Sequence, residues 1–238
     1  MAYNSAKYTQ DPDYQEGMDC FLKCDYDGAM EHFTCAADNG NPEAEFRIAK
    51  LYYYGRGCDE NKSEALVWMR KAAQHGHPQA MNETAMMYYR GNGVQKSYDK
   101  MADWLENASD AGNIDGIYNL GTMLERGIGF EKNLSRACEC YRKASDAGYA
   151  QASYCLAHMY HNGLGVETDL KKAAELCKKA ADGGIADAAY DYALILHDGD
   201  GVDIDDDMAF RYFLKAKELG SKDADGYIKL LSTQKPRN

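Results

Sequence analysis

Apolar residues recur along this chain at helical spacing, in pairs of blocks. Between residues 41 and 76 the apolar positions of the two blocks are Ala44, Ile48, Leu51 and Tyr52, then Ala65, Trp68, Met69 and Ala72. A spacing that averages about 3.6 residues places such positions on one face of an α-helix. The pattern therefore predicts two helices, separated by a turn that contains Gly55 and Gly57.

The same pattern repeats every 36 residues, and glycines mark the repeat most clearly. The first series of glycines is Gly40, Gly76, Gly112, Gly148, Gly184 and Gly220. Two more series lie in the turn between the blocks: Gly55, Gly91, Gly127, Gly163 and Gly199, and then Gly57, Gly93, Gly129, Gly165 and Gly201. A glycine after a helical block can adopt the positive φ that ends a helix. A fixed period of this length indicates an array of two-helix repeats.

Small residues keep the same period, which predicts close contacts between helices. The two columns are Ala72, Ala108, Ala144, Ala180 and Ala216, and Ala49, Ala85, Gly121, Ala157 and Ala193. One hairpin buries too little apolar surface to be stable alone, so neighbouring hairpins must stack and share an apolar seam. The predicted fold class is all-α, an α/α superhelical solenoid of tandem 36-residue two-helix repeats.

The third of these repeats carries the motifs of a known family. They are Asn119-Leu120-Gly121-Thr122-Met123-Leu124, Gly127 and Gly129, Arg136-Ala137, Arg142-Lys143-Ala144 and Gly148. This set resembles the Sel1-like repeat family, which is related to tetratricopeptide repeats. The resemblance covers five full units from Asn41 to Gly220.

Both ends of the chain depart from the repeat. The expected organisation is an N-terminal tail (1–10), a variant tetratricopeptide-like first hairpin without the Gly-x-Gly turn (11–40), five Sel1-like repeats (41–76, 77–112, 113–148, 149–184 and 185–220, together 41–220), and a C-terminal capping helix and tail (221–238). A terminal helix must present a polar face to solvent, and Gly226 and Lys229 stand where other units have aromatic or small residues.

Charge narrows the range of partners. The chain of 238 residues has 27 Lys and Arg against 38 Asp and Glu, a net charge of -11. This charge opposes the approach of nucleic acid or of an anionic lipid surface. No apolar run is long enough to span a bilayer, and the first residues contain no apolar signal region, so we expect no membrane insertion and a cytoplasmic protein.

The cysteines do not follow the repeat. All eight fall at different phases of the period, whereas a disulfide framework would place pairs at the same two phases in each unit. This departs from the secreted, cysteine-rich branch of Sel1-like proteins, so the penicillin-related activity attached to that branch is not carried over. Cys20, Cys24, His32 and Cys35 fall on two helices of the first hairpin, and zinc binding or simple packing both remain open for them.

No cofactor or catalytic set is expected. The Gly-x-Gly turns lack the preceding strand, the third glycine and the lysine of phosphate-binding loops. His158, His161 and His197 have phases that can bring them to one surface, where they would hold a metal or act as a base, but no phased nucleophile accompanies them. An enzyme or a metal-dependent small-ligand protein, centred on these histidines or on the first-hairpin cysteines, is the alternative function.

The resemblance implies that the first helix of each repeat lines a concave groove. The side chains expected there are Phe46, Lys50, Tyr53, Tyr89, Arg90, Tyr118, Arg126, Tyr154, His158, His161, Tyr190 and His197. Aromatic rings provide contact area at low entropic cost, and polar groups fix the register of a bound chain. For the column of Phe46, Asn82, Tyr118, Tyr154 and Tyr190, packing against the neighbouring helix is the preferred interpretation, and partner binding is the alternative. The sequence thus predicts a non-enzymatic adaptor or scaffold that binds a peptide or a partner protein.

Overall fold

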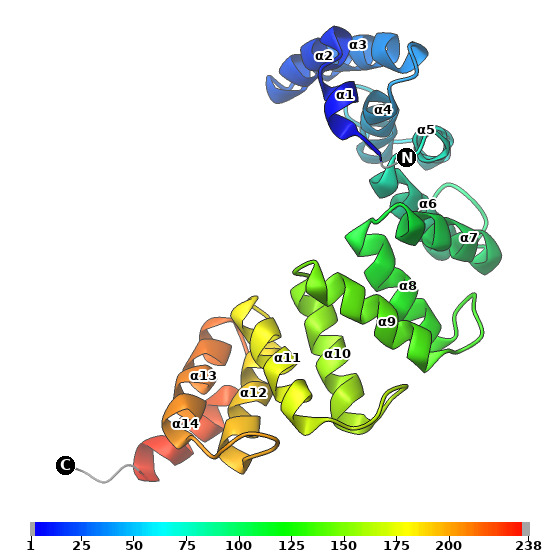
Figure 1. The fold of residues 1–238 in the computed structure, drawn as a ribbon. Coiled ribbons are helices and arrows are strands. Elements are labelled where there is room, and N and C mark those ends of the chain that lie inside the picture. The colour runs from blue at the N-terminus through cyan, green and yellow to red at the C-terminus, as the bar shows by residue number, and fades with distance from the viewer. Residues whose placement is uncertain (1–2, 235–238) are drawn as a thin grey trace. The chain divides into compact units, whose positions relative to one another are not determined.

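A computed structural model describes residues 3–234, and their side chains as far as residue 231. This part of the chain contains 14 α-helices and no strand (Figure 1). The outermost residues of the expected N-terminal tail and C-terminal tail, 1–2 and 235–238, lie outside the described residues. The all-α fold class expected from the repeat is confirmed.

Ten helices of 13 residues form the repeats, and of the four helices outside them one has 13 residues and three are shorter. Before the repeats lie Ser5–Thr9 (α1), Pro12–Leu22 (α2) and Tyr26–Asp38 (α3). The first helices of the five repeats are Pro42–Tyr54 (α4), Pro78–Arg90 (α6), Ile114–Arg126 (α8), Ala150–Asn162 (α10) and Ala186–Asp198 (α12). The second helices are Lys62–Gln74 (α5), Tyr98–Asp110 (α7), Leu134–Asp146 (α9), Leu170–Asp182 (α11) and Asp206–Glu218 (α13), and Ala224–Gln234 (α14) follows them.

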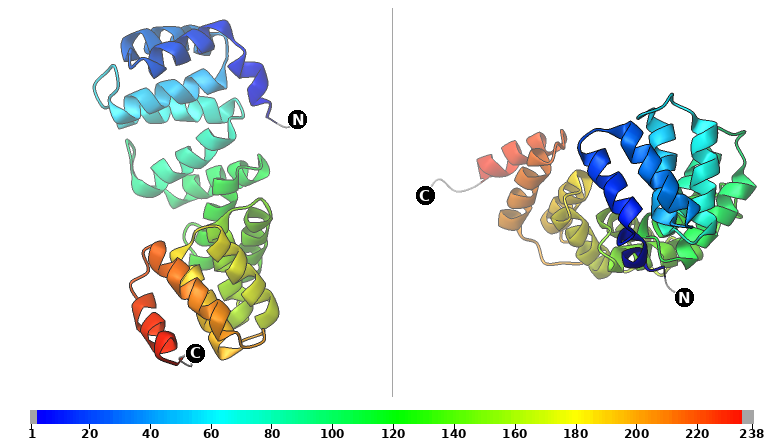
Figure 2. Two further views of the ribbon diagram at one scale, coloured as in Figure 1. Left: turned by 90° about the vertical axis from the view of Figure 1, so that its left-hand side faces the viewer. Right: turned by 90° about the horizontal axis from the view of Figure 1, so that it is seen from above.

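The helices gather into two compact units. Unit 1 comprises the described residues up to Leu120 together with Ile128–Glu131, and unit 2 comprises Gly121–Gly127 and the described residues from Lys132 onward. Within unit 1, α3 packs on α4 and α5 on α6, and within unit 2, α11 packs on α12 and α13 on α14 (Figure 2). Within each unit, these contacts join hairpins that are neighbours in the sequence.

A column of polar residues starts the second helix of each repeat. These N-cap residues are Asn61, Ser97, Asn133, Asp169 and Asp205, and each side chain accepts a hydrogen bond from the backbone amide three residues later. The backbone amide of the N-cap residue also donates to a carbonyl near the end of the first helix, as from Asp169 to Tyr160 at 3.0 Å. The N-cap residue thus caps the second helix with its side chain and links the turn to the first helix through its backbone amide.

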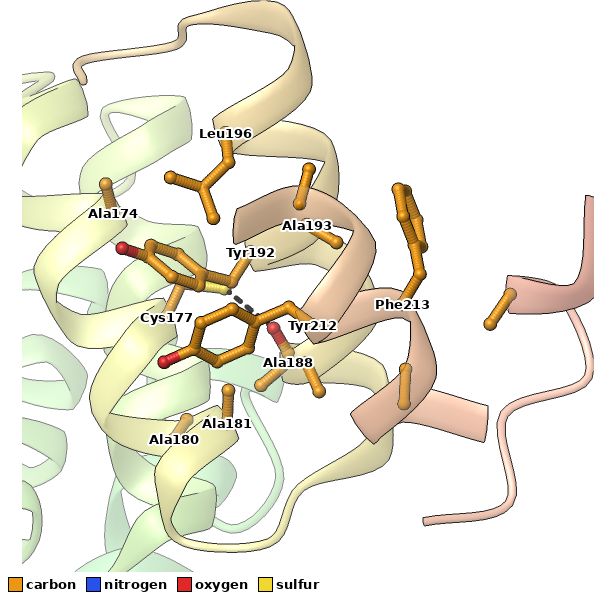
Figure 3. Packing of buried hydrophobic residues seen from close by; sticks show 14 of the residues in the cluster. Ala174, Cys177, Ala180, Ala181, Ala188, Tyr192, Ala193, Leu196, Tyr212 and Phe213 are labelled. Carbon is orange, nitrogen blue, oxygen red and sulfur yellow. Dashed lines mark hydrogen bonds between the residues drawn. The ribbon is translucent and has the colours of Figure 1, made fainter. Parts of the chain in front are cut away.

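Alanines and tyrosines fill the core of unit 2. Ala180, Ala188 and Ala193 are completely buried, so the backbones of α11 and α12 can approach closely. Tyr192 and Tyr212 meet edge to face between these helices and α13, with ring centroids 4.7 Å apart (Figure 3). Small residues at the repeat phases therefore set the distance between the helices, and aromatic rings fill the space left between them.

Candidate functional site

A pocket of about 250 Å³ opens in unit 2 between two consecutive first helices, α10 and α12. On α10, Tyr154, His158 and His161 are three or four residues apart and so share one helix face. On α12, Asp191, Leu194, Ile195 and Asp198 share a face in the same way, and Asp200 follows in the turn. The pocket thus follows from the repeat, because α10 and α12 are first helices of consecutive repeats and both line it with one face.

The floor of the pocket consists of small, buried side chains. Ala157, Ala173 and Cys177 line it with exposed fractions of 5%, 2% and 3%. The Cys177 thiol donates to the carbonyl oxygen of Ala188 at 3.3 Å (Figure 3). Burial, with a smaller contribution from the charge of Asp191, raises the pKa of Cys177 to about 12. The thiol therefore stays protonated at neutral pH and is a poor nucleophile.

One wall carries a fixed polar group of three residues. The Tyr154 hydroxyl donates to Oδ2 of Asp191 at 2.8 Å, and His158 Nε2 lies 3.6 Å from the same oxygen. The Tyr154 and His158 rings meet edge to face at 4.5 Å. Burial and the Asp191 carboxylate raise the pKa of Tyr154, so its hydroxyl remains a neutral donor. These contacts hold Asp191 at the pocket without a lysine or arginine.

The rim is exposed and acidic. Asp198, Asp200 and His161 lie at the mouth, and all three are exposed. Neither carboxylate of Asp198 and Asp200 makes a hydrogen bond or ion pair with a described residue. No lysine or arginine occurs among the described residues that line the pocket. The mouth therefore presents two carboxylates, those of Asp198 and Asp200, that are paired with no lysine or arginine.

The structure brings only some of the predicted residues together. Tyr154, His158 and His161 line the pocket, whereas His197 pairs with Asp206 at 2.6 Å outside it. Tyr190 packs edge to face on Phe213, with ring centroids 5.6 Å apart. This contact agrees with the packing interpretation of the column that contains Tyr190. Arg126, also in unit 2, is exposed and does not line the pocket.

The predicted residues of unit 1 make contacts of their own. Phe46 stacks on His77 at 4.5 Å, and Lys50 pairs with Glu83 at 2.5 Å. The Tyr53 hydroxyl accepts from the Asn92 amide at 2.9 Å. The remaining three differ in exposure: Tyr89 and Tyr118 are half-buried, and Arg90 is exposed.

The first-hairpin cysteines do not assemble with His32. Cys24 and Cys35 are exposed, and His32 Nδ1 lies 3.3 Å from a carboxylate oxygen of Glu16. Over residues 3–231, no group of three or more His, Cys, Asp or Glu side chains is arranged to hold a metal ion.

Sequence reasoning missed the floor and part of the rim. Ala157 was recognised as a close-contact position, but Ala173, Cys177 and Ile195 were not assigned to any site. One signal was available for the rim, because Asp200 stands between Gly199 and Gly201 in the turn that ends α12.

The comparisons with known proteins agree with this repeat architecture. The family model of the Sel1 repeat matches residues 14–41, 42–77, 78–113, 114–149, 150–185 and 186–221. The matches thus include the first hairpin, which contains α2 and α3. No match was found among curated proteins.

Several solved structures of bacterial proteins are similar to this chain. The protective antigen c5321 of uropathogenic Escherichia coli, which displays an SLR fold, is 26% identical with a TM-score of 0.86, over 98% of this chain and 52% of that one. This chain therefore spans about half the length of that antigen. A Sel1 repeat protein from Oxalobacter formigenes is 26% identical with a TM-score of 0.85, over 93% of both chains. The immunity protein PA5088 from Pseudomonas aeruginosa, 20% identical with a TM-score of 0.52 over 98% of this chain and 88% of that one, shares the fold.

Proposed function

The chain belongs to the Sel1 repeat family, and on that premise we propose that it is a non-enzymatic adaptor or scaffold that binds a peptide or a partner protein on the face formed by its first helices. Sel1 repeats commonly serve as scaffolds for protein–protein interaction, and the family is generally non-enzymatic. The observation that carries the proposal is the pocket between α10 and α12, at the phases expected for partner binding.

The size and composition of the pocket suit one side chain of a partner. Its volume of about 250 Å³ lies below the range of about 300–1,000 Å³ that is usual for small-molecule sites. A half-buried aromatic ring beside oriented polar groups is typical of the anchor points that dominate the energy of protein interfaces. Tyr154 and His158 provide such a group, and the buried floor beneath them excludes water.

The protonation of the pocket residues favours binding over catalysis. The one thiol that lines the pocket, Cys177, is held protonated by burial, and the Tyr154 hydroxyl is engaged by Asp191. Catalysis by a nucleophile requires a group that is activated by a base or by a lowered pKa. The raised pKa values of Cys177 and Tyr154 have the opposite effect.

We propose the class of partner from the charge of the chain and the compartment from its cysteines. A net charge of -11 disfavours nucleic acid, so we propose a protein or peptide partner. Over the described residues, no helix combines the length and the apolar character needed to cross a bilayer. The cytoplasm is the compartment that we propose, because the cysteines ignore the repeat phase and Cys177 is a packing residue.

The proposal is tested by selecting binding peptides from a displayed random library and measuring their affinity by fluorescence anisotropy. Replacing Tyr154 and His158 by alanine should weaken binding by about 2 kcal/mol or more, roughly 30-fold, if they are anchor contacts. The matched control replaces Lys171 and Glu175 by alanine, because both are exposed on the second helix α11 and neither lines the pocket. Circular dichroism checks that each variant retains its helices. Peptides that lose affinity only in the α11 variant would contradict the proposal.

A further inference from the structure

We infer that the pocket between α10 and α12 receives an arginine or lysine side chain of the bound partner. The inference rests on the proposed function, since it names the chemistry of the residue that the same pocket holds. Three features carry it: the apolar lining, the carboxylates at the mouth, and the absence of a lysine or arginine from the described lining residues.

The lining matches the stem of a long basic side chain. Ala157, Ala173, Leu194 and Ile195 present methyl and methylene groups to the interior of the pocket. Lysine and arginine bury their aliphatic stems along such surfaces and keep the charged end at a polar rim. A long basic side chain can therefore place its aliphatic stem on the apolar floor and its charged end among the carboxylates at the mouth.

The carboxylates match the charged end. Asp191 is held in place by the Tyr154 hydroxyl at 2.8 Å, and a carboxylate oxygen can accept further hydrogen bonds. Asp198 and Asp200 make no side-chain bond with a described residue, so a bound cation would not have to displace an existing partner. Charge-assisted hydrogen bonds are about twice as strong as neutral ones.

Other side chains fit less well for physical reasons. An acidic side chain would be repelled by three carboxylates within one small pocket. A purely apolar side chain would offer no donor to the carboxylates of Asp198 and Asp200, and covering polar groups without a compensating hydrogen bond is costly. The net charge of -11 acts in the same direction, because it attracts a basic partner at long range.

The first experiment uses small probes and needs no natural partner. The protein carries ¹³C-labelled methyl groups on alanine, leucine and isoleucine, so that Ala157, Ala173, Leu194 and Ile195 report directly from the pocket. The probes are acetyl-Gly-X-Gly-amide tripeptides in which X is arginine, lysine, citrulline or norleucine. Citrulline keeps the shape of arginine without its charge, and norleucine keeps the stem of lysine without the ammonium group. The arginine and lysine probes should shift these four methyl signals saturably, at least about tenfold more tightly than the neutral probes.

A matched pair of variants separates the pocket from general charge. D198N/D200N should weaken the arginine probe about tenfold and leave the norleucine probe unchanged. The control E175Q/E218Q removes the same two charges at exposed positions of α11 and α13 that do not line the pocket. The control should change the affinity by no more than about twofold, because exposed charges at a distance are screened by salt.

Three results would overturn the inference: equal or tighter binding of norleucine or citrulline, equal losses in the two double variants, or no saturable shift with any probe. The peptides selected for the proposed function provide an independent comparison. Selected peptides that depend on Tyr154 and His158 but contain no basic residue would overturn the inference and leave the proposed function intact. Selected peptides that bind elsewhere would overturn the proposed function, while the tripeptide result would still decide what the pocket accepts.

Discussion

The two glycines of each turn have different physical roles, which Gly163 and Gly165 illustrate in unit 2. Gly163 ends α10 with φ of 65°, and a Cβ there would clash only with the Thr168 hydroxyl oxygen, at 2.8 Å, since the nearest backbone atom lies 3.7 Å away. Gly165 has φ of 71°, but its Cβ would lie 2.4 Å from the carbonyl carbon of Leu134 at the start of α9. The second glycine is therefore required by conformation and also by the close approach of the preceding hairpin.

Comparison of G148A with G165A separates these two requirements. Gly148 has φ of 91°, and no neighbouring atom lies within 4 Å of the place that a Cβ would occupy, so G148A should cost only backbone strain, about 1–2 kcal/mol. G165A carries the same strain and also pushes against the backbone at Leu134, which should add about 1–3 kcal/mol as overpacking does. Urea unfolding followed by circular dichroism measures both. Equal losses would mean that the start of α9 moves aside at little cost.

Among the elements, the helices of the repeats were predictable and the pocket was not. The 36-residue period gave both helices of each repeat. The N-cap column itself required structure, because Asn61 and Ser97 are different residue types at one phase. The pocket depends on the gap between α10 and α12, and single-helix periodicity says nothing about such a gap.

The N-terminal segment, expected to be a tail, contains the helix α1, and this segment packs against α4 within unit 1. The Tyr3 hydroxyl donates to Glu43 on α4 at 3.1 Å, and the Tyr3 ring lies 5.4 Å from His77. The Asn41 amide donates to the carbonyl oxygen of Tyr8, at the end of the docked segment, at 2.8 Å. His77 in turn stacks on Phe46, so this part of the first-helix face is occupied by the chain's own residues.

Glu43 makes this docking sensitive to acid. Burial alone would raise the pKa of Glu43, but the His77 imidazole, whose Nε2 lies 3.4 Å from a carboxylate oxygen, and the hydrogen bonds from Ser5 and Tyr3 outweigh it and lower the pKa from 4.5 to about 2. A carboxylate with a lowered pKa contributes stability above its unfolded pKa, and this contribution is lost as the pH falls toward the folded value. The side chain is only 12% exposed, so the contribution is on the order of 2–3 kcal/mol at neutral pH.

E43Q should therefore be less stable than the native chain at pH 7, and the difference should shrink between pH 4.5 and pH 2. Trp68 and Trp104 both lie in unit 1, so urea unfolding followed by tryptophan fluorescence reports on the relevant part of the chain. E31Q is the matched control, because Glu31 is exposed on α3. Stability curves of E43Q and E31Q that run parallel through this pH range would assign the acid sensitivity to other groups.

At the scale of the whole molecule, an array of stacked hairpins leaves an apolar face at each end that needs a cover. In unit 2, α14 covers α12 and α13. Tyr227 stacks on Phe213 with ring centroids 4.8 Å apart and meets Tyr190 edge to face at 6.0 Å. Phe213 is completely buried in this arrangement, so removing α14 would expose an aromatic ring together with the alanines around it.

Deleting residues 221–238 should accordingly lower the melting temperature of unit 2 and increase the binding of a hydrophobic dye. Two adjacent leucines test the same cover without truncation, because Leu231 is 4% exposed and Leu230 is 44% exposed. L231A should cost about 2–5 kcal/mol, the usual range for a leucine truncated in a core, whereas L230A should cost little. Circular dichroism melting compares the three variants with the native chain. A deletion variant as heat-resistant and as soluble as the full chain, with equal effects of the two leucine substitutions, would show that α14 is not the cap and that the face of α13 is stable in water on its own.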